Sequence, residues 1–113
     1  MKPDDLVRLR HIAEALTAAI GFVQGRRRED LEVDTMLRFA LVHAIQVAGE
    51  AASRVSPETR SQNPDIPWAS IIGMRHRLVH AYVDINNDIL WTTVTEAAPG
   101  VLASITALLE RDG

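Results

Sequence analysis

Apolar side chains recur at alternating steps of three and four residues along most of this 113-residue chain, and this spacing restricts the fold more than any other feature. The first stripe runs from residue 4 to about residue 24, and Gly25 with the three arginines after it is typical of a helix end. The stripe consists of Leu6, Leu9, Ala13, Leu16, Ile20 and Val23. No segment alternates apolar and polar residues as a half-buried strand would. The sequence therefore predicts an all-α fold.

Two helices are predicted to follow the first one. A second long helix should begin near Asp34 or somewhat before it and end near Val55, and its many small residues would let a neighbouring helix approach closely. The segment Ser56-Pro57-Glu58 then supplies an N-cap, a first-turn proline and an early acid. These three residues predict a short helix, which the pair Asn63-Pro64 ends.

The last two predicted helices each contain a residue that helices disfavour. One begins at Pro67 and contains Gly73, which costs about 1 kcal/mol relative to alanine and so predicts a close helix contact. The other runs from about Asp88 to Arg111, where Pro99 removes a backbone hydrogen bond and should kink the helix. Its expected inward residues are Trp91, Val94, Ala98, Val101, Leu102, Ile105 and Leu108 or Leu109. The predicted architecture is an up-and-down bundle of four main helices plus one short helix, in a single domain over residues 1–113.

Composition restricts the classes of function. A formal net charge of -3 argues against a broad basic face that coats nucleic acid, and five aromatic residues do not supply the stacking platforms of RRM or OB modules. The absence of cysteine excludes disulfides and thiolate zinc sites. The longest apolar stretch, around residues 18–23, is too short to span a bilayer. We expect a soluble cytoplasmic protein, outside any membrane, whose contact with RNA would be local.

Residues 75–82 read Arg-His-Arg-Leu-Val-His-Ala-Tyr and gather ionisable side chains near a predicted helix end. The order arginine, four residues, histidine, one residue, tyrosine resembles the signature of the HepT-like branch of the HEPN superfamily. These proteins are RNA-cleaving toxins of prokaryotic toxin-antitoxin pairs. Other segments resemble the family in the same order along the chain: residues 47–52 with their Gly-Glu-Ala, residues 56–58, residues 66–74 and residues 83–86.

The resemblance implies a metal-independent endoribonuclease. RNA is cleaved without metal when a base takes the ribose 2′-hydroxyl proton, an acid protonates the leaving 5′-oxygen, and cations stabilise the phosphate. Histidine suits both proton roles, and the fork of donors on arginine matches phosphate oxygens. By this resemblance His80 is the acid or base, and Arg75 holds and stabilises the phosphate.

The spacing of Arg75 and His80 also bears on assembly. Residues five apart on an uninterrupted helix point about 140° from each other, so the two side chains of one chain would not share a face. Either the helix unwinds near His80 or a second chain completes the site. HEPN proteins generally dimerise through this region, and we therefore predict a homodimer with a composite site that contains two arginines and two histidines.

The resemblance gives Tyr82 a separate role. HepT-like toxins are paired with a small MntA-like nucleotidyltransferase antitoxin, which attaches AMP to the motif tyrosine. Phosphate charge and nucleotide bulk beside His80 and Arg75 would repel RNA and block the cleft. AMPylation would thus silence the site by charge and by shape.

Three further polar residues are auxiliary candidates. His76 lies four residues before His80, which is the spacing of zinc-binding helices, but Arg77 stands where the metalloprotease motif has glutamate and no third ligand is evident. We therefore expect no metal or other cofactor, and Arg77 could add a phosphate contact. Glu50 could orient a motif residue, and a solvated or capping role fits it equally well.

Other charged and aromatic residues have structural interpretations. His11 and His43 are expected to be satisfied structural groups, and Trp68 and Trp91 to be core anchors. The run Arg26-Arg27-Arg28 could grip an RNA backbone, but a charge run at a helix end is more often solvated.

Two alternative functions compete with the ribonuclease. The same dimer could be a non-catalytic module that docks a nucleotidyltransferase or binds nucleotide. A metal hydrolase that uses the two close histidines would lose its activity with a chelator. Intact Arg75, His80 and Tyr82 favour the ribonuclease.

Overall fold

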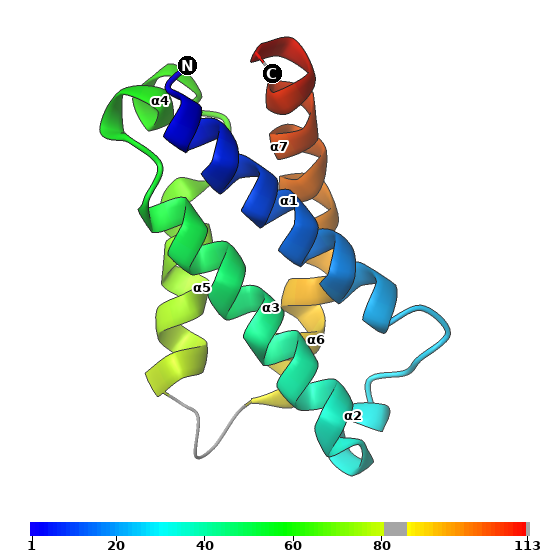
Figure 1. The fold of residues 1–113 in the computed structure, drawn as a ribbon. Helices are drawn as coiled ribbons and strands as arrows, with labels where there is room; N and C mark the ends of the chain where they lie inside the picture. The colour runs from blue at the N-terminus through cyan, green and yellow to red at the C-terminus, as the bar shows by residue number, and fades with distance from the viewer. Residues whose placement is uncertain (81–85, 113) are drawn as a thin grey trace.

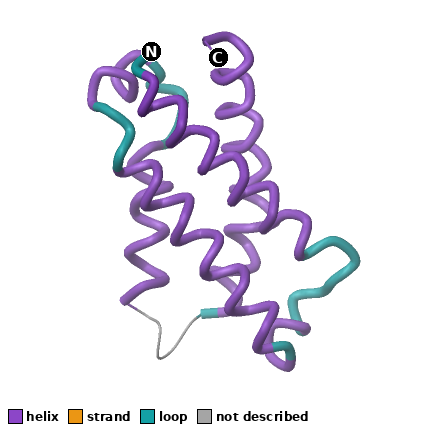
Figure 2. The backbone as a smooth tube through the Cα atoms, in the orientation of Figure 1, coloured by secondary structure: helices purple, strands orange, loops and turns teal. Residues whose placement is uncertain are grey.

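The computed structural model describes the backbone of residues 1–80 and 86–112, and the side chains of residues 1–74 and 86–112 (Figure 1). Its elements are α1 (Pro3–Phe22), α2 (Asp30–Val33), α3 (Thr35–Ser53), α4 (Pro57–Gln62), α5 (Trp68–His80), α6 (Asn87–Thr92), the π-helical turn η1 (Thr93–Ala97) and α7 (Ala98–Asp112). Helices and their connections account for all of these residues, and none of them forms a strand (Figure 2). The predicted all-α class is confirmed.

Four long helical rods run up and down beside one another (Figure 1). Helix α3 lies between α1 and α5, and α1 packs on its other side against α7. The segments α6, η1 and α7 follow one another without a break and form the fourth rod. Outside the four rods, the described part of the chain has two short helices, α2 and α4, whereas the sequence predicted only α4.

The observed caps explain where the helices begin and end. Asp34 precedes α3, and its Oδ1 accepts a hydrogen bond from the backbone N–H of Leu37 at 3.0 Å. Ser56 precedes α4, and its Oγ accepts from the N–H of Thr59 at 3.4 Å. Gly25 follows the end of α1 with a φ of 71°, a left-handed conformation that favours glycine. The helix limits predicted from these residues are confirmed.

The start of α5 is fixed by a buried asparagine. The indole Nε1 of Trp68 donates to the carbonyl oxygen of Asn63 at 3.0 Å. The side chain of Asn63 in turn donates to the carbonyl of Thr59 at 2.9 Å and accepts from the guanidinium of Arg111 at 2.9 Å. This small network joins α4, α5 and α7, and it makes Trp68 the core anchor that the sequence predicted.

The fourth rod contains the irregularity predicted near Pro99, but the irregularity lies before the proline. Pro99 has no N–H to donate, and the five residues before Ala98 form a π-helical turn in which the N–H of Ala98 donates to the carbonyl of Thr93. Leu90 is fully buried, whereas Trp91 is only half-buried and packs at the edge of the core. Trp91 thus packs against the core as predicted, whereas Leu90, which was not among the predicted inward residues, is the first fully buried side chain of this rod.

The fourth rod also has the length and apolar content of a membrane-spanning helix over residues 87–112. A third of its most apolar window is buried inside the bundle, and its inward residues belong to the core. These inward residues are Leu90, Val94, Ala98, Val101, Ile105 and Leu108. A core helix passes the same test of length and composition, so this feature is weak evidence for a membrane.

A buried carboxylate joins the N-terminal end of α1 to α4. Asp5 is 2% exposed and accepts hydrogen bonds from the backbone N–H of Ser56 at 2.9 Å and from the hydroxyls of Ser56 and Thr59, each at 2.6 Å. Burial raises the pKa of Asp5, but the hydrogen bonds from Ser56 and Thr59 outweigh it and hold the pKa below its usual value of 3.8. The charged form is therefore the one that stabilises the fold.

Replacement of Asp5 by asparagine should lower the free energy of unfolding at neutral pH by about 1–3 kcal/mol, because the charged acceptor of three hydrogen bonds is lost. The contribution of Asp5 is fully present above the unfolded-state pKa of 3.8 and is lost as the pH falls through the lower folded-state pKa. Urea unfolding at several pH values measures both effects. Asp4→Asn makes the same charge change on an exposed neighbour, and an equal loss in that control would refute the assignment.

Candidate active site

The predicted motif lies on the last turns of α5. The helical backbone extends through His80, so positions 75 and 80 point about 140° apart around the helix axis. Unwinding of the helix before His80, one of the two solutions considered from the sequence, is therefore not observed. The side chains of Arg75, His76, Arg77 and His80, and the whole of Tyr82, lie outside the described residues. Their contacts remain predictions.

Helix α5 is packed against the bundle mainly through α3, with Ile71 buried between them. Two open grooves border the other faces of its described part, residues 68–74. The groove between α4 and α5 has a volume of about 670 Å³, and the groove between α5 and η1 has a volume of about 660 Å³. Ala69 and Gly73, one helical turn apart, line both grooves.

Gly73 does not make the close helix contact that the sequence predicted. A Cβ atom added to it would meet no other atom of the described structure within 4 Å, because its face of α5 opens onto the two grooves. Among the described residues the prediction was wrong, and no helix contact there offsets the lower helix propensity of Gly73.

The groove between α5 and η1 has polar residues on both sides. Ser70 lies on α5, and Thr92 and Glu96 lie across from it on the fourth rod. Met74, the last described side chain of α5, also lines this groove, so the groove borders the beginning of the motif. Glu96 was not a sequence candidate because a single glutamate on a helix carries no signal. π-Helical turns such as η1, on which it lies, are frequent at functional sites.

Glu50 lies on α3, where its Oε1 accepts from the guanidinium Nε of Arg54 at 2.9 Å. It lines a groove of about 310 Å³ between α1 and α3, with Arg8, His11 and His43. The two histidines left out of the predicted site thus share a groove with one of its auxiliary residues. The role of Glu50 toward a motif side chain stays a prediction.

The arginine run after α1 serves the fold. Arg28 pairs with Glu32 at 2.7 Å and with Asp88 at 2.5 Å, which ties the connection after α1 to the beginning of α6. Arg26 forms ion pairs with acids in and just after α2, Asp30 and Asp34. Two of the three arginines are therefore occupied by carboxylates, in agreement with their exclusion from the predicted site.

The protein is a small up-and-down helical bundle that carries an Arg/His motif at the end of its third rod. This is the all-α architecture that the resemblance to the HEPN superfamily implied. The chain itself belongs to the HepT-like ribonuclease family, whose model, described as "Ribonuclease HepT-like", matches residues 12–108. The match includes the motif, both grooves and Glu50. No solved structure matches the chain.

Relatives of known name agree with this membership. A protein of Caldanaerobacter subterraneus subsp. tengcongensis, provisionally named an RNase, is 31% identical over 104 residues, which cover 92% of this chain and 93% of that protein. A protein of Thermococcus cleftensis, provisionally named ribonuclease HepT, is 33% identical over 93 residues, which cover 82% and 84%. A third, from Methanocaldococcus jannaschii and provisionally named an RNase, is 29% identical over 90 residues, covering 80% and 83%.

Replacement of Gly73 by alanine should raise the free energy of unfolding by about 0.5–1 kcal/mol, because alanine is the better helix former and the added methyl group meets no atom. Ala69→Gly, one turn earlier on the same face, should lower it by a similar amount. Denaturant unfolding of both variants checks the pair. A destabilised Gly73→Ala would mean that something beyond the described residues approaches this glycine.

Proposed function

We propose that this protein is a metal-independent endoribonuclease that acts as the toxin of a toxin-antitoxin pair, with Arg75 and His80 as its catalytic residues. Membership of the HepT-like ribonuclease family is the observation that carries the proposal. Relatives over most of the chain whose names state an RNase activity support it. The intact order Arg75, His80, Tyr82 at the end of α5 adds to this support.

The chemistry requires two proton transfers and one charge stabiliser. A base removes the 2′-hydroxyl proton, the 2′-oxygen attacks the adjacent phosphorus, and the P–O5′ bond breaks as an acid protonates the 5′-oxygen. The products are a 2′,3′-cyclic phosphate end and a 5′-hydroxyl end. Histidine performs either proton transfer near neutral pH, and the guanidinium of Arg75 stabilises the phosphate in the transition state.

We further propose that the active unit is a homodimer. An uninterrupted α5 puts positions 75 and 80 of one chain on different faces, which supports a site that joins Arg75 of one chain to His80 of the other. Two-fold symmetry then brings two histidines to one cleft, which supplies both the acid and the base. His76, Arg77 and Glu50 are auxiliary polar residues in this proposal.

Arg75→Ala and His80→Ala should each abolish cleavage of single-stranded RNA in EDTA. A mixture of the two variants, refolded together or expressed together, should regain part of the activity, because a mixed dimer keeps one Arg75 and one His80 in different chains. Gel electrophoresis of a labelled RNA measures the activity.

The control for this complementation is a mixture of Arg75→Ala with the double variant Arg75→Ala/His80→Ala, which can restore no complete pair. Activity that reappears equally in the control would contradict a shared site. Full activity of either single variant alone would contradict the roles assigned to Arg75 and His80.

We propose that Tyr82 is the regulatory residue, AMPylated by an MntA-like nucleotidyltransferase antitoxin. Its position two residues after His80 supports this role, because an added AMP would carry negative charge to the place where RNA phosphate must bind. The phenol is not needed for the cleavage chemistry above. Loss of the hydroxyl should therefore uncouple regulation from activity.

Tyr82→Phe should cleave RNA as the unmodified wild type does and should stay active after incubation with an MntA-like nucleotidyltransferase, ATP and Mg²⁺. The wild type should gain the mass of AMP and lose activity under the same conditions. Mass spectrometry and the cleavage assay read the two effects. An AMP adduct on Tyr82→Phe would place the modification elsewhere in the chain.

A further inference from the structure

The groove between α4 and α5 contains an arginine whose side chain has no hydrogen-bond or ion-pair partner among the described residues. Arg60, on α4, lies half-buried, and its Nε is one of two buried side-chain polar atoms in the described structure that have no hydrogen-bond partner. No ion pair forms with its guanidinium among the described residues. A buried unpaired donor costs free energy, and here it belongs to a permanent cation.

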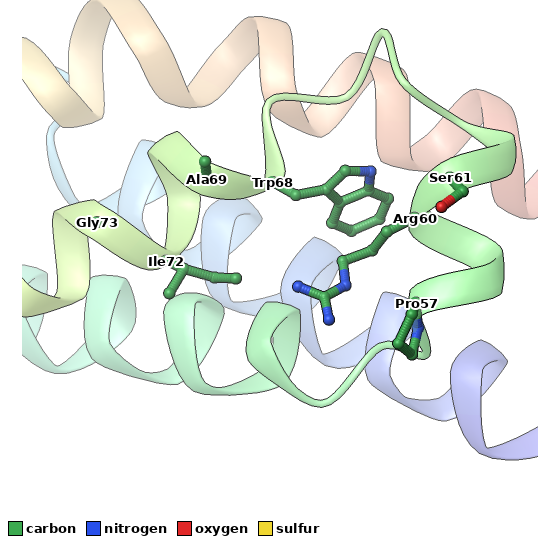
Figure 3. A pocket seen from close by; sticks show the side chains of 7 residues that line it. All are labelled: Pro57, Arg60, Ser61, Trp68, Ala69, Ile72 and Gly73. Carbon is green, nitrogen blue, oxygen red and sulfur yellow. The ribbon is translucent and has the colours of Figure 1, made fainter.

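The surroundings of Arg60 suit an anion with an apolar neighbour. Its side chain extends from α4 across the groove, where Ile72 and Trp68 of α5 form the opposite wall (Figure 3). The complete lining is Pro57, Arg60, Ser61, Trp68, Ala69, Ile72 and Gly73. No acid is among these residues, so the positive charge of Arg60 is not neutralised inside the groove.

The groove leads along α5 toward the motif. Steps of three and four residues from Ile72 reach positions 75 and 76, and a step of seven from Gly73 reaches position 80. The helical register therefore continues the stripe of Ala69 and Gly73 into positions 76 and 80, whereas position 75 lies at the opposite edge of the groove, on the side of Trp68. At 1.5 Å per residue, these positions lie roughly 5–12 Å further along the axis, within the reach of neighbouring nucleotides.

We propose that Arg60 is a phosphate-binding subsite for RNA that lies beside the cleaved bond. The inference rests on the proposed function and adds to it a specific contact outside the motif. The Arg60 guanidinium donates to a backbone phosphate one or a few nucleotides from the scissile one, and the apolar wall of Ile72 and Trp68 faces the adjoining sugar or base. The subsite positions RNA and takes no part in proton transfer.

Binding of a fluorescein-labelled single-stranded RNA to the His80→Ala protein over a series of salt concentrations tests the subsite. Addition of Arg60→Gln should weaken binding about tenfold and reduce the slope of log affinity against log salt by about 0.7, as the loss of one phosphate contact predicts. Addition of Arg10→Gln, which removes an exposed arginine of α1 outside this groove, should change neither quantity.

Arg60→Lys separates charge from shape. It should keep the salt slope, because lysine also releases a counterion from phosphate, and should recover part of the affinity. Thermal unfolding and size-exclusion chromatography of each variant show whether it keeps the fold and assembly. If Arg60→Gln keeps the slope, or weakens binding only by unfolding or dissociating the protein, the subsite is refuted.

The subsite and the proposed function fail in different ways. Cleavage of RNA by the wild type with no effect of Arg60 on the salt slope would overturn the subsite and leave the ribonuclease. An Arg60-dependent slope without cleavage by the wild type would support the subsite and overturn the ribonuclease. Absence of RNA binding by the His80→Ala protein would overturn the subsite.

Discussion

The rest of the structure depends on the close packing of α3 between α1 and α5. Small residues on two sides of α3 allow both neighbours to approach, and among these Ala44, Ala48 and Ala52 are buried in the core. Helix α5 is attached to the bundle largely through this one contact, and its other described residues, within 68–74, border two grooves. A motif-bearing helix that is packed on one side and borders grooves on others is suited to the proposed site, which RNA and a second chain would both have to reach.

Local signals in the sequence were sufficient for most of the helix limits. Ser56 accepts a hydrogen bond from a backbone N–H as the predicted N-cap, a helix begins directly after Asp34, and Trp68 is a core anchor. Contacts between residues far apart in the sequence could not be predicted from it. Nothing near Asp5 in the sequence indicates that it meets Ser56 across 51 residues, and the π-helical turn that places Leu90 inward depends on how the whole rod packs.

For the candidate site as well, local patterns could be predicted from the sequence and long-range arrangements could not. The motif could be identified from the order of Arg75, His80 and Tyr82, because ionisable residues in a fixed spacing are a local pattern. The openness of the groove at Gly73 and the unpaired guanidinium of Arg60 could not be identified, because both follow from which helices do not cover α5. A lone arginine on a short helix has no sequence signal. The reason to consider Arg60 a binding residue is that no carboxylate among the residues lining its groove neutralises its charge.

Metal-independent cleavage of RNA through His80 is the proposed activity on which the proposed regulation and the RNA subsite both rest. The most direct measurement is digestion of a mixed-sequence RNA in EDTA by the purified protein, shown to be folded and unmodified at Tyr82, with the product ends analysed. We expect chelator-resistant cleavage that leaves 2′,3′-cyclic phosphate ends and is absent in His80→Ala. No cleavage by that protein, or cleavage that EDTA abolishes, would contradict it.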